Sequence, residues 1–186
     1  MPIADFSRVF AVRAGATFAA ALAASLGLAV TITGAQANLR LAGYPGLSEV
    51  APGTIVIRTH ERALYYVMEP GRAIRYPIAV PKYGKEWSGY ARVNGKFTNP
   101  DWAPPPVVKR DHPELPDVIR GGSPTNPMGV AALTLDRDEI AIHGTTQKMR
   151  ASIGRAASYG CIRMLNEDVT DLFGRVTVGT PVLMTP

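Results

Sequence analysis

Short runs of β-branched and aromatic residues, separated by turn-forming residues, constrain the fold of this chain most strongly. Three such runs follow one another at residues 54–58, 64–67 and 74–80, with turn residues at 60–62 and 69–71 between them. Short runs of this composition bounded by Gly, Pro and charged residues are typical of strands joined by tight turns. We therefore predict a β meander over residues 54–80.

A long stretch rich in chain breakers follows the meander. Residues 81–127 include three consecutive prolines at 104–106 and a Gly pair at 121–122. Proline and glycine interrupt regular structure, and long loops in compact domains are often functional. We expect one short strand around residues 91–98 and otherwise a long, ordered surface loop, in which Trp102 provides a packing group.

The last third of the chain returns to strand patterns and adds one helix. Strands are expected at residues 130–135, at 139–142 ending on His143, and at 182–184. Asn166 is a suitable cap for a short helix, with acidic residues in its first turn. The helix has one apolar stripe at helical spacing, formed by Val169, Leu172, Phe173 and Val176. The prediction is a mainly β domain, closed or sandwiched and barrel-like, with one short helix after Cys161.

Length and composition limit the classes of protein that fit. A chain of 186 residues with 46% hydrophobic and 19% charged residues forms one domain and is not a disordered chain. Its formal charge of +5 comes from 20 Lys and Arg spread along the sequence. Without a basic run to follow a phosphate backbone, nucleic acid is not an expected partner.

The N-terminal segment has the features of an export signal. Arg8 and Arg13 precede an uncharged, mostly apolar run at residues 14–33, and Ala35-Gln36-Ala37 provides a small-x-small cleavage pattern. We predict a signal peptide over residues 1–37 and export to the periplasm or cell envelope. The alternative is an uncleaved anchor, which would be the only contact with a membrane.

Residues 38–53 are then expected to form a linker, and residues 54–186 the folded domain.

Cysteine and histidine usage limits the chemistry of that domain. Cys161 is the only cysteine, which excludes an intramolecular disulfide and a multi-cysteine zinc site. The three histidines, His60, His112 and His143, lack metal-ligand spacing. We expect neither a metal nor another cofactor.

His143 and Cys161 both lie at the ends of predicted elements, where catalytic groups are common. An imidazole that accepts the thiol proton makes a cysteine strongly nucleophilic. Gly160 lets the backbone N–H groups around Cys161 approach one substrate oxygen, as in an oxyanion hole. Arg163 offers a planar fork for a carboxylate. Taken singly, each residue also has a structural interpretation: a buried thiol, a hydrogen-bonded imidazole, or an arginine in an ion pair.

Several short motifs lie at residues 99–105, 126–129, 142–145, 152–154, 158–164 and 166–169. Together they resemble a known family, the L,D-transpeptidase catalytic domain, also called the YkuD domain. The resemblance extends to the opening strands and the closing strand of the chain. Two departures are present: Tyr159 stands where many members have His, and residues 87–90 read Trp-Ser-Gly-Tyr where many have Thr-Pro-Thr-Gly.

The resemblance implies roles for particular residues. Cys161 would be the nucleophile, His143 the group that accepts and returns its proton, and Gly160 part of a backbone oxyanion hole. The residues expected to bind substrate are Arg163, Gly144, Ser158, Tyr159 and Trp102.

The resemblance also implies a reaction on peptidoglycan stem peptides. Cys161 would form a thioester and release D-alanine, and an amine of a second stem would give a 3→3 cross-link. The acceptor could instead be water, which makes a carboxypeptidase, a lysine of an envelope protein, or a free D-amino acid. The remaining alternative is a non-catalytic module that binds the cell wall.

Overall fold

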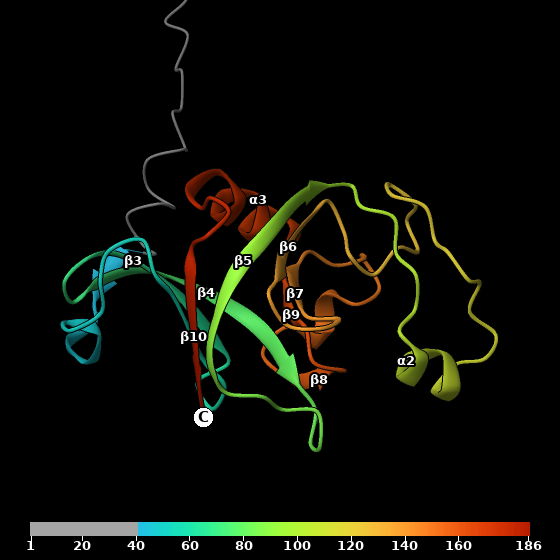
Figure 1. Ribbon diagram of the computed structural model, residues 1–186, viewed down its shortest axis with the longest axis horizontal. Helices are drawn as coiled ribbons and strands as arrows, with labels where there is room; N and C mark the ends of the chain where they lie inside the picture. Colours follow the sequence, from blue (N-terminus) through green and yellow to red (C-terminus); the bar gives the residue numbers. More distant parts are fainter. Residues whose placement is uncertain (1–40) are drawn as a thin grey trace, which may run out of the picture. The chain divides into compact units, whose positions relative to one another are not determined.

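Within residues 41–186, the part of the chain that the computed structural model describes, ten strands form one hydrogen-bonded sheet (Figure 1). The signal segment expected at residues 1–37 lies outside these described residues. The strands are β1 (Leu41–Gly43), β2 (Ile55–Arg58), β3 (Ala63–Glu69), β4 (Arg72–Pro81), β5 (Gly89–Thr98), β6 (Ala131–Leu135), β7 (Ala141–His143), β8 (Ala156–Ser158), β9 (Ile162–Met164) and β10 (Pro181–Thr185).

The sheet closes into a barrel of eight strands. Their order is β4-β3-β2-β10-β5-β6-β7-β9, and β9 pairs again with β4 to complete the circle. The long strand β4 makes closure possible, because residues 72–77 pair with β3 while residues 78–79 pair with β9. Strands β1 and β8 also pair with β4 and lie outside the circle. The predicted mainly β, closed architecture is confirmed.

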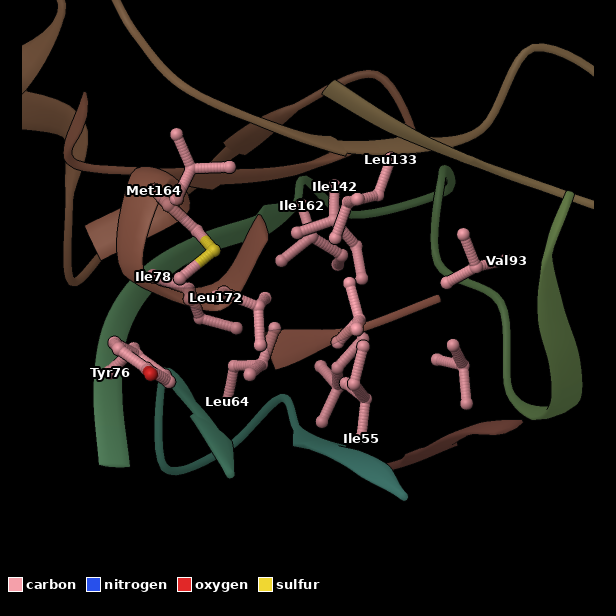
Figure 2. Close-up of a cluster of buried hydrophobic side chains, with 14 of the residues drawn as sticks. Ile55, Leu64, Tyr76, Ile78, Val93, Leu133, Ile142, Ile162, Met164 and Leu172 are labelled. Carbon is pink, nitrogen blue, oxygen red and sulfur yellow. The ribbon is translucent and has the colours of Figure 1, made fainter. Parts of the chain in front are cut away.

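The barrel is filled by aliphatic side chains from nearly every strand. Figure 2 shows Ile55 and Leu64 facing Leu133, Ile142 and Ile162 across the interior. All five side chains are fully buried. Such alternating inward positions supply the apolar burial that stabilises a small barrel.

The predicted meander and the later strands are present, with boundaries that differ by a few residues. The expected strand around residues 91–98 is longer, since β5 begins at Gly89. The sequence pattern did not indicate β1, β8 or β9, each of which has three residues. Within the segment expected to be a linker, β1 pairs with β4 and Leu47 is buried in a second apolar cluster.

The helix after Cys161 is α3 (Asn166–Arg175). Val169, Leu172 and Val176 of its predicted apolar stripe are buried in the barrel core, and Phe173 packs against it. The expected cap is wrong: Leu165 is the N-cap residue, and Asn166 is the first residue of the helix. The Asn166 side chain accepts a hydrogen bond from the N–H of Thr145 instead, at 2.8 Å.

The loop between β5 and β6 is ordered by internal hydrogen bonds, and it contains an unexpected short helix, α2 (Pro106–Asp111) (Figure 1). Trp102 and Ile119 pair through their backbones across the loop. The buried amide of Asn126 donates to the carbonyl oxygens of Pro100, Ile119 and Arg120, at 2.8–3.1 Å. These bonds hold the two ends of the loop together.

The described residues also include two short 3-10 helices, η1 (Pro45–Leu47) and η2 (Arg150–Ser152). None of the helices within residues 41–186 is long and apolar enough to cross a bilayer.

We predict that Leu133→Ala lowers the free energy of unfolding by about 2–5 kcal/mol, because Leu133 is fully buried and the barrel cannot collapse onto the cavity. Urea denaturation measures this change. The control is Val178→Ala at a site with 62% of its surface exposed, where about 0.5 kcal/mol or less is expected. Equal losses in the two variants would contradict the assignment of Leu133 to the core.

Candidate active site

The parallel pairing of β7 with β9 brings the predicted catalytic residues together. His143 lies directly opposite Arg163 in this ladder, and Ile142 lies opposite Ile162. Cys161 immediately precedes β9. Residues two apart on an extended chain share a face, so Cys161 and Arg163 lie on the side of the sheet on which His143 projects.

This face forms the wall of a cleft of about 770 Å³. His143, Cys161 and Arg163 line it, as do the predicted substrate-binding residues Ser158 and Tyr159. Trp102 lines it from the β5–β6 loop. The predicted glycines, Gly144 and Gly160, are chain neighbours of lining residues.

His143 is buried and held in one tautomer. Its Nδ1 donates to the carbonyl oxygen of Gly144 at 2.8 Å, which leaves Nε2 as a proton acceptor. Burial, followed by the charge of Arg163, lowers the pKa of His143 from 6.5 to about 4. The imidazole is therefore neutral at physiological pH and able to accept a proton.

Cys161 is half-buried, and its thiol donates to the carbonyl oxygen of Glu139 at 3.4 Å. Burial raises the pKa of this thiol, while the N–H of Ala141 and the charge of Arg163 act in the opposite direction. The raised pKa of Cys161 and the lowered pKa of His143 together favour a neutral thiol and a neutral imidazole in the absence of substrate.

Gly160 allows a backbone conformation that other residues rarely adopt. Its φ is +138°, and a Cβ at this position would lie 2.6 Å from Cδ1 of Ile140. The N–H of Gly160 donates to Ser158 Oγ at 3.3 Å, and the same hydroxyl donates to the carbonyl oxygen of Cys161 at 2.5 Å. Ser158 therefore braces the turn that carries Cys161.

Arg163 is a buried cation that lines the cleft. Its Nη1 donates to Ser152 Oγ at 2.7 Å, while its buried Nε has no hydrogen-bond partner within the described residues. Among the residues that the structure describes, no acidic side chain forms a salt bridge with Arg163, and burial lowers its pKa from the usual value. A cation in this state is suited to bind an anionic group of a ligand.

Gly144 follows His143 at a point of close packing. A Cβ on Gly144 would lie 2.3 Å from Oδ1 of Asn166, and one on Gly129 would lie 2.4 Å from the same atom. Oδ1 of Asn166 also accepts the N–H of Thr145. Gly144 thus lets helix α3 approach the strand that ends at His143.

Tyr159 connects the turn that carries Cys161 to the β5–β6 loop. Its hydroxyl donates to Oδ2 of Asp111 at 3.0 Å, at the end of α2. Lys82 Nζ lies 3.5 Å from the centre of the Tyr159 ring, in a cation–π contact. Tyr159, which stands where many members of the family have His, therefore links the turn at Cys161 to the β5–β6 loop.

Residues 52–184 match the family model for YkuD, the L,D-transpeptidase catalytic domain. This match covers well over half of the chain. The chain belongs to the L,D-transpeptidase catalytic domain family.

Relatives of this L,D-transpeptidase domain agree with the match. The "Probable L,D-transpeptidase YbiS" of Escherichia coli K12 is 37% identical over an alignment of 137 residues, which covers 69% of this chain and 43% of YbiS. The chain thus spans less than half the length of this relative.

Solved structures share the fold. An L,D-transpeptidase from Mycobacterium smegmatis has a TM-score of 0.57 at 14% identity, covering 72% of this chain and 58% of that one. A Brucella melitensis structure described as a probable carnitine operon oxidoreductase is 40% identical, with a TM-score of 0.51, covering 75% of this chain and 88% of that one. The description of the latter names another activity, although its fold is similar.

The sequence did not predict the part that several residues of this L,D-transpeptidase domain have in the site. Ser152, which binds Arg163, and Glu139, whose carbonyl oxygen accepts the Cys161 thiol, both line the cleft. Trp87, which the sequence marked only as part of a departure from the family pattern, donates to the carbonyl oxygen of Gly160. Only Ser152 lay in a segment that carried the family resemblance. Within residues 41–186 no group of three or more His, Cys, Asp and Glu could hold a metal.

The lowered pKa of His143 predicts a loss of stability on acidification. The unfolded imidazole binds a proton below a pH of about 6.5, whereas the folded one does so only below about 4. The unfolded state therefore binds more protons in this window, and stability falls as the pH falls from about 6.5 to about 4.

Urea denaturation across this pH window measures the loss. His143→Gln, which cannot titrate, should remove the part of the pH dependence that comes from His143. The control His60→Gln, in an exposed turn, should keep it. An unchanged pH dependence in His143→Gln would contradict the prediction.

Proposed function

We propose that this chain is a cysteine-dependent L,D-transpeptidase that acts on peptidoglycan stem peptides. The observation that carries the proposal is the cleft wall where His143, Cys161 and the buried cation Arg163 lie together. A module that only binds the cell wall needs neither a proton acceptor nor a thiol at this place.

In the proposed first step, Cys161 Sγ attacks the carbonyl carbon between the diamino acid and the terminal D-alanine. The thiol proton moves to Nε2 of His143 as the C–S bond forms, because the neutral pair is favoured before attack. The N–H of Cys161 would stabilise the developing oxyanion, since that of Gly160 donates to Ser158. His143 then returns the proton to the leaving amine, and the C–N bond breaks.

In the proposed second step, an acceptor amine attacks the thioester. A new C–N bond forms, the C–S bond breaks, and the thiol regains a proton through His143. A diamino acid side chain as acceptor gives a 3→3 cross-link, and water gives a shortened stem. Each amide formed replaces one that was broken, so the exchange requires no nucleotide or other cofactor.

Peptidoglycan lies outside the cytoplasmic membrane, so the proposed place of action is the cell envelope. The export signal expected at residues 1–37 supports this localisation. An envelope protein with an accessible lysine would be a chemically equivalent acceptor.

We expect Cys161→Ser to abolish release of D-alanine from tetrapeptide muropeptides, because a serine hydroxyl beside the same base ionises far less than a thiol. Mass spectrometry of the products measures the loss and separates cross-linked dimers from shortened stems. The control Ser123→Ala, on the exposed part of the β5–β6 loop, should leave the rate unchanged. A tenth of the wild-type rate in Cys161→Ser would contradict the nucleophile assignment.

We expect Arg163→Lys to weaken the use of a stem donor that ends in a carboxylate, because lysine keeps the charge but loses the fork. A charge-assisted hydrogen bond contributes about 1.5–3 kcal/mol, which is a loss of roughly 10–150-fold in kcat/KM. The rate of Cys161 alkylation by iodoacetamide should change little.

The control is Arg150→Lys, since Arg150 pairs with Glu167 outside the cleft. Equal losses of donor use and alkylation in Arg163→Lys, with a lowered melting temperature, would make Arg163 a structural residue.

A further inference from the structure

Trp87 contacts the turn that carries Cys161, residues 158–161, but does not itself line the cleft. It lies in the loop between β4 and β5, is half-buried, and packs against the barrel core. Its Nε1 donates to the carbonyl oxygen of Gly160 at 3.0 Å. This bond joins two segments that are 73 residues apart in the sequence.

The bond acts on the peptide group that contains the N–H of Cys161. The carbonyl oxygen of Gly160 and the N–H of Cys161 belong to one planar, trans peptide, and in such a peptide they point in opposite directions. Fixing the direction of the carbonyl therefore fixes the direction of the N–H. Gly160 has no Cβ, so on its side the chain itself restricts the rotation of this peptide only weakly.

Two side chains together fix three consecutive peptide groups by hydrogen bonds. Ser158 Oγ accepts the N–H of Gly160 and donates to the carbonyl oxygen of Cys161, and so holds the peptides before and after the middle one. Trp87 holds the middle peptide, between Gly160 and Cys161. The serine and the indole are thus complementary parts of one support.

The indole is itself held in place by Arg137. The Arg137 guanidinium lies 4.6 Å from the centre of the Trp87 ring, and its Nη2 donates to the carbonyl oxygen of Ser88 at 3.0 Å. Arg137 lies in the turn between β6 and β7, the strand that ends at His143. Through Arg137, the indole that holds the Gly160–Cys161 peptide is therefore anchored to the turn before the strand that ends at His143.

We infer that Trp87 is a positioning residue that aims the N–H of Cys161 at the oxyanion of the acylation step. The inference rests on the proposed function, because it concerns the transition state of acyl transfer to Cys161. It predicts that losing the indole N–H weakens reactions that pass through an oxyanion and leaves other reactions of the same thiol unchanged.

The test compares two reactions of Cys161 in the full chain. A carbapenem acylates the thiol through a tetrahedral oxyanion, whereas iodoacetamide alkylates it by displacing iodide, with no oxyanion. Trp87→Phe removes the N–H donor. In a second variant benzothienylalanine replaces Trp87, so that sulfur takes the place of the N–H in a ring of the same shape. Tyr83→Phe is the control, because this loop residue is 97% exposed.

We expect the ratio of acylation rate to alkylation rate to fall about tenfold in both Trp87 variants, less than the 10²–10³-fold cost of losing an oxyanion donor outright. The ratio should stay within about twofold of wild type in Tyr83→Phe. If Trp87→Phe is too unstable to purify, the isosteric variant gives the same comparison with the packing kept.

An unchanged ratio in the isosteric variant, or an equal fall in both rates, would overturn the inference. If the wild-type protein is not acylated at all, the proposed function fails and the inference fails with it. A normal wild-type acylation rate with an unchanged ratio overturns the role of Trp87 alone.

Discussion

The parallel pairing of β7 with β9 is the constraint on which the rest of the structure depends. It places His143 opposite Arg163 and sets Cys161 at the start of the neighbouring strand. The same strand β9 pairs with β4 on its other side and closes the barrel. Strand β9 therefore serves both barrel closure and the site. A shift of its register by one residue would turn Arg163 away from the cleft and break the packing of Ile162 and Met164 in the core.

Burial sets the protonation states of the site, and Arg163 adjusts them. Its charge lowers the pKa of His143 and also lowers that of the Cys161 thiol, so it favours the thiolate but weakens the base. A donor carboxylate bound to Arg163 would offset this charge and raise the pKa of His143 towards its usual range. Substrate binding would then make the imidazole a stronger base at the moment when the thiol attacks.

The sequence predicted those parts of the structure that have a strong local signal. The strands of the meander and the apolar stripe around Leu172 follow from residue type and spacing, and so does the position of His143 at the end of a strand. Strands β8 and β9 did not, because three residues are too few to show alternation and their partners are distant in the chain. Asn166 was misread for a related reason: its type suits a helix cap, but tertiary contact with Thr145 gives its side chain another partner.

The two departures from the common family pattern both make contacts at the turn that carries Cys161. Tyr159 contacts Asp111 on the β5–β6 loop, whereas Trp87 contacts Gly160 from the β4–β5 loop. From sequence alone, a change at residues 87–90 is most simply interpreted as a change in which stem or acceptor fits. The hydrogen bond from Trp87 leads to another interpretation, because it acts on the backbone of the nucleophile and not on the lining of the cleft. With the proposed function and the inferred role of Trp87, the β4–β5 loop would act on how Cys161 is presented. The β5–β6 loop and Arg163, which line the cleft, would then act on which substrate binds.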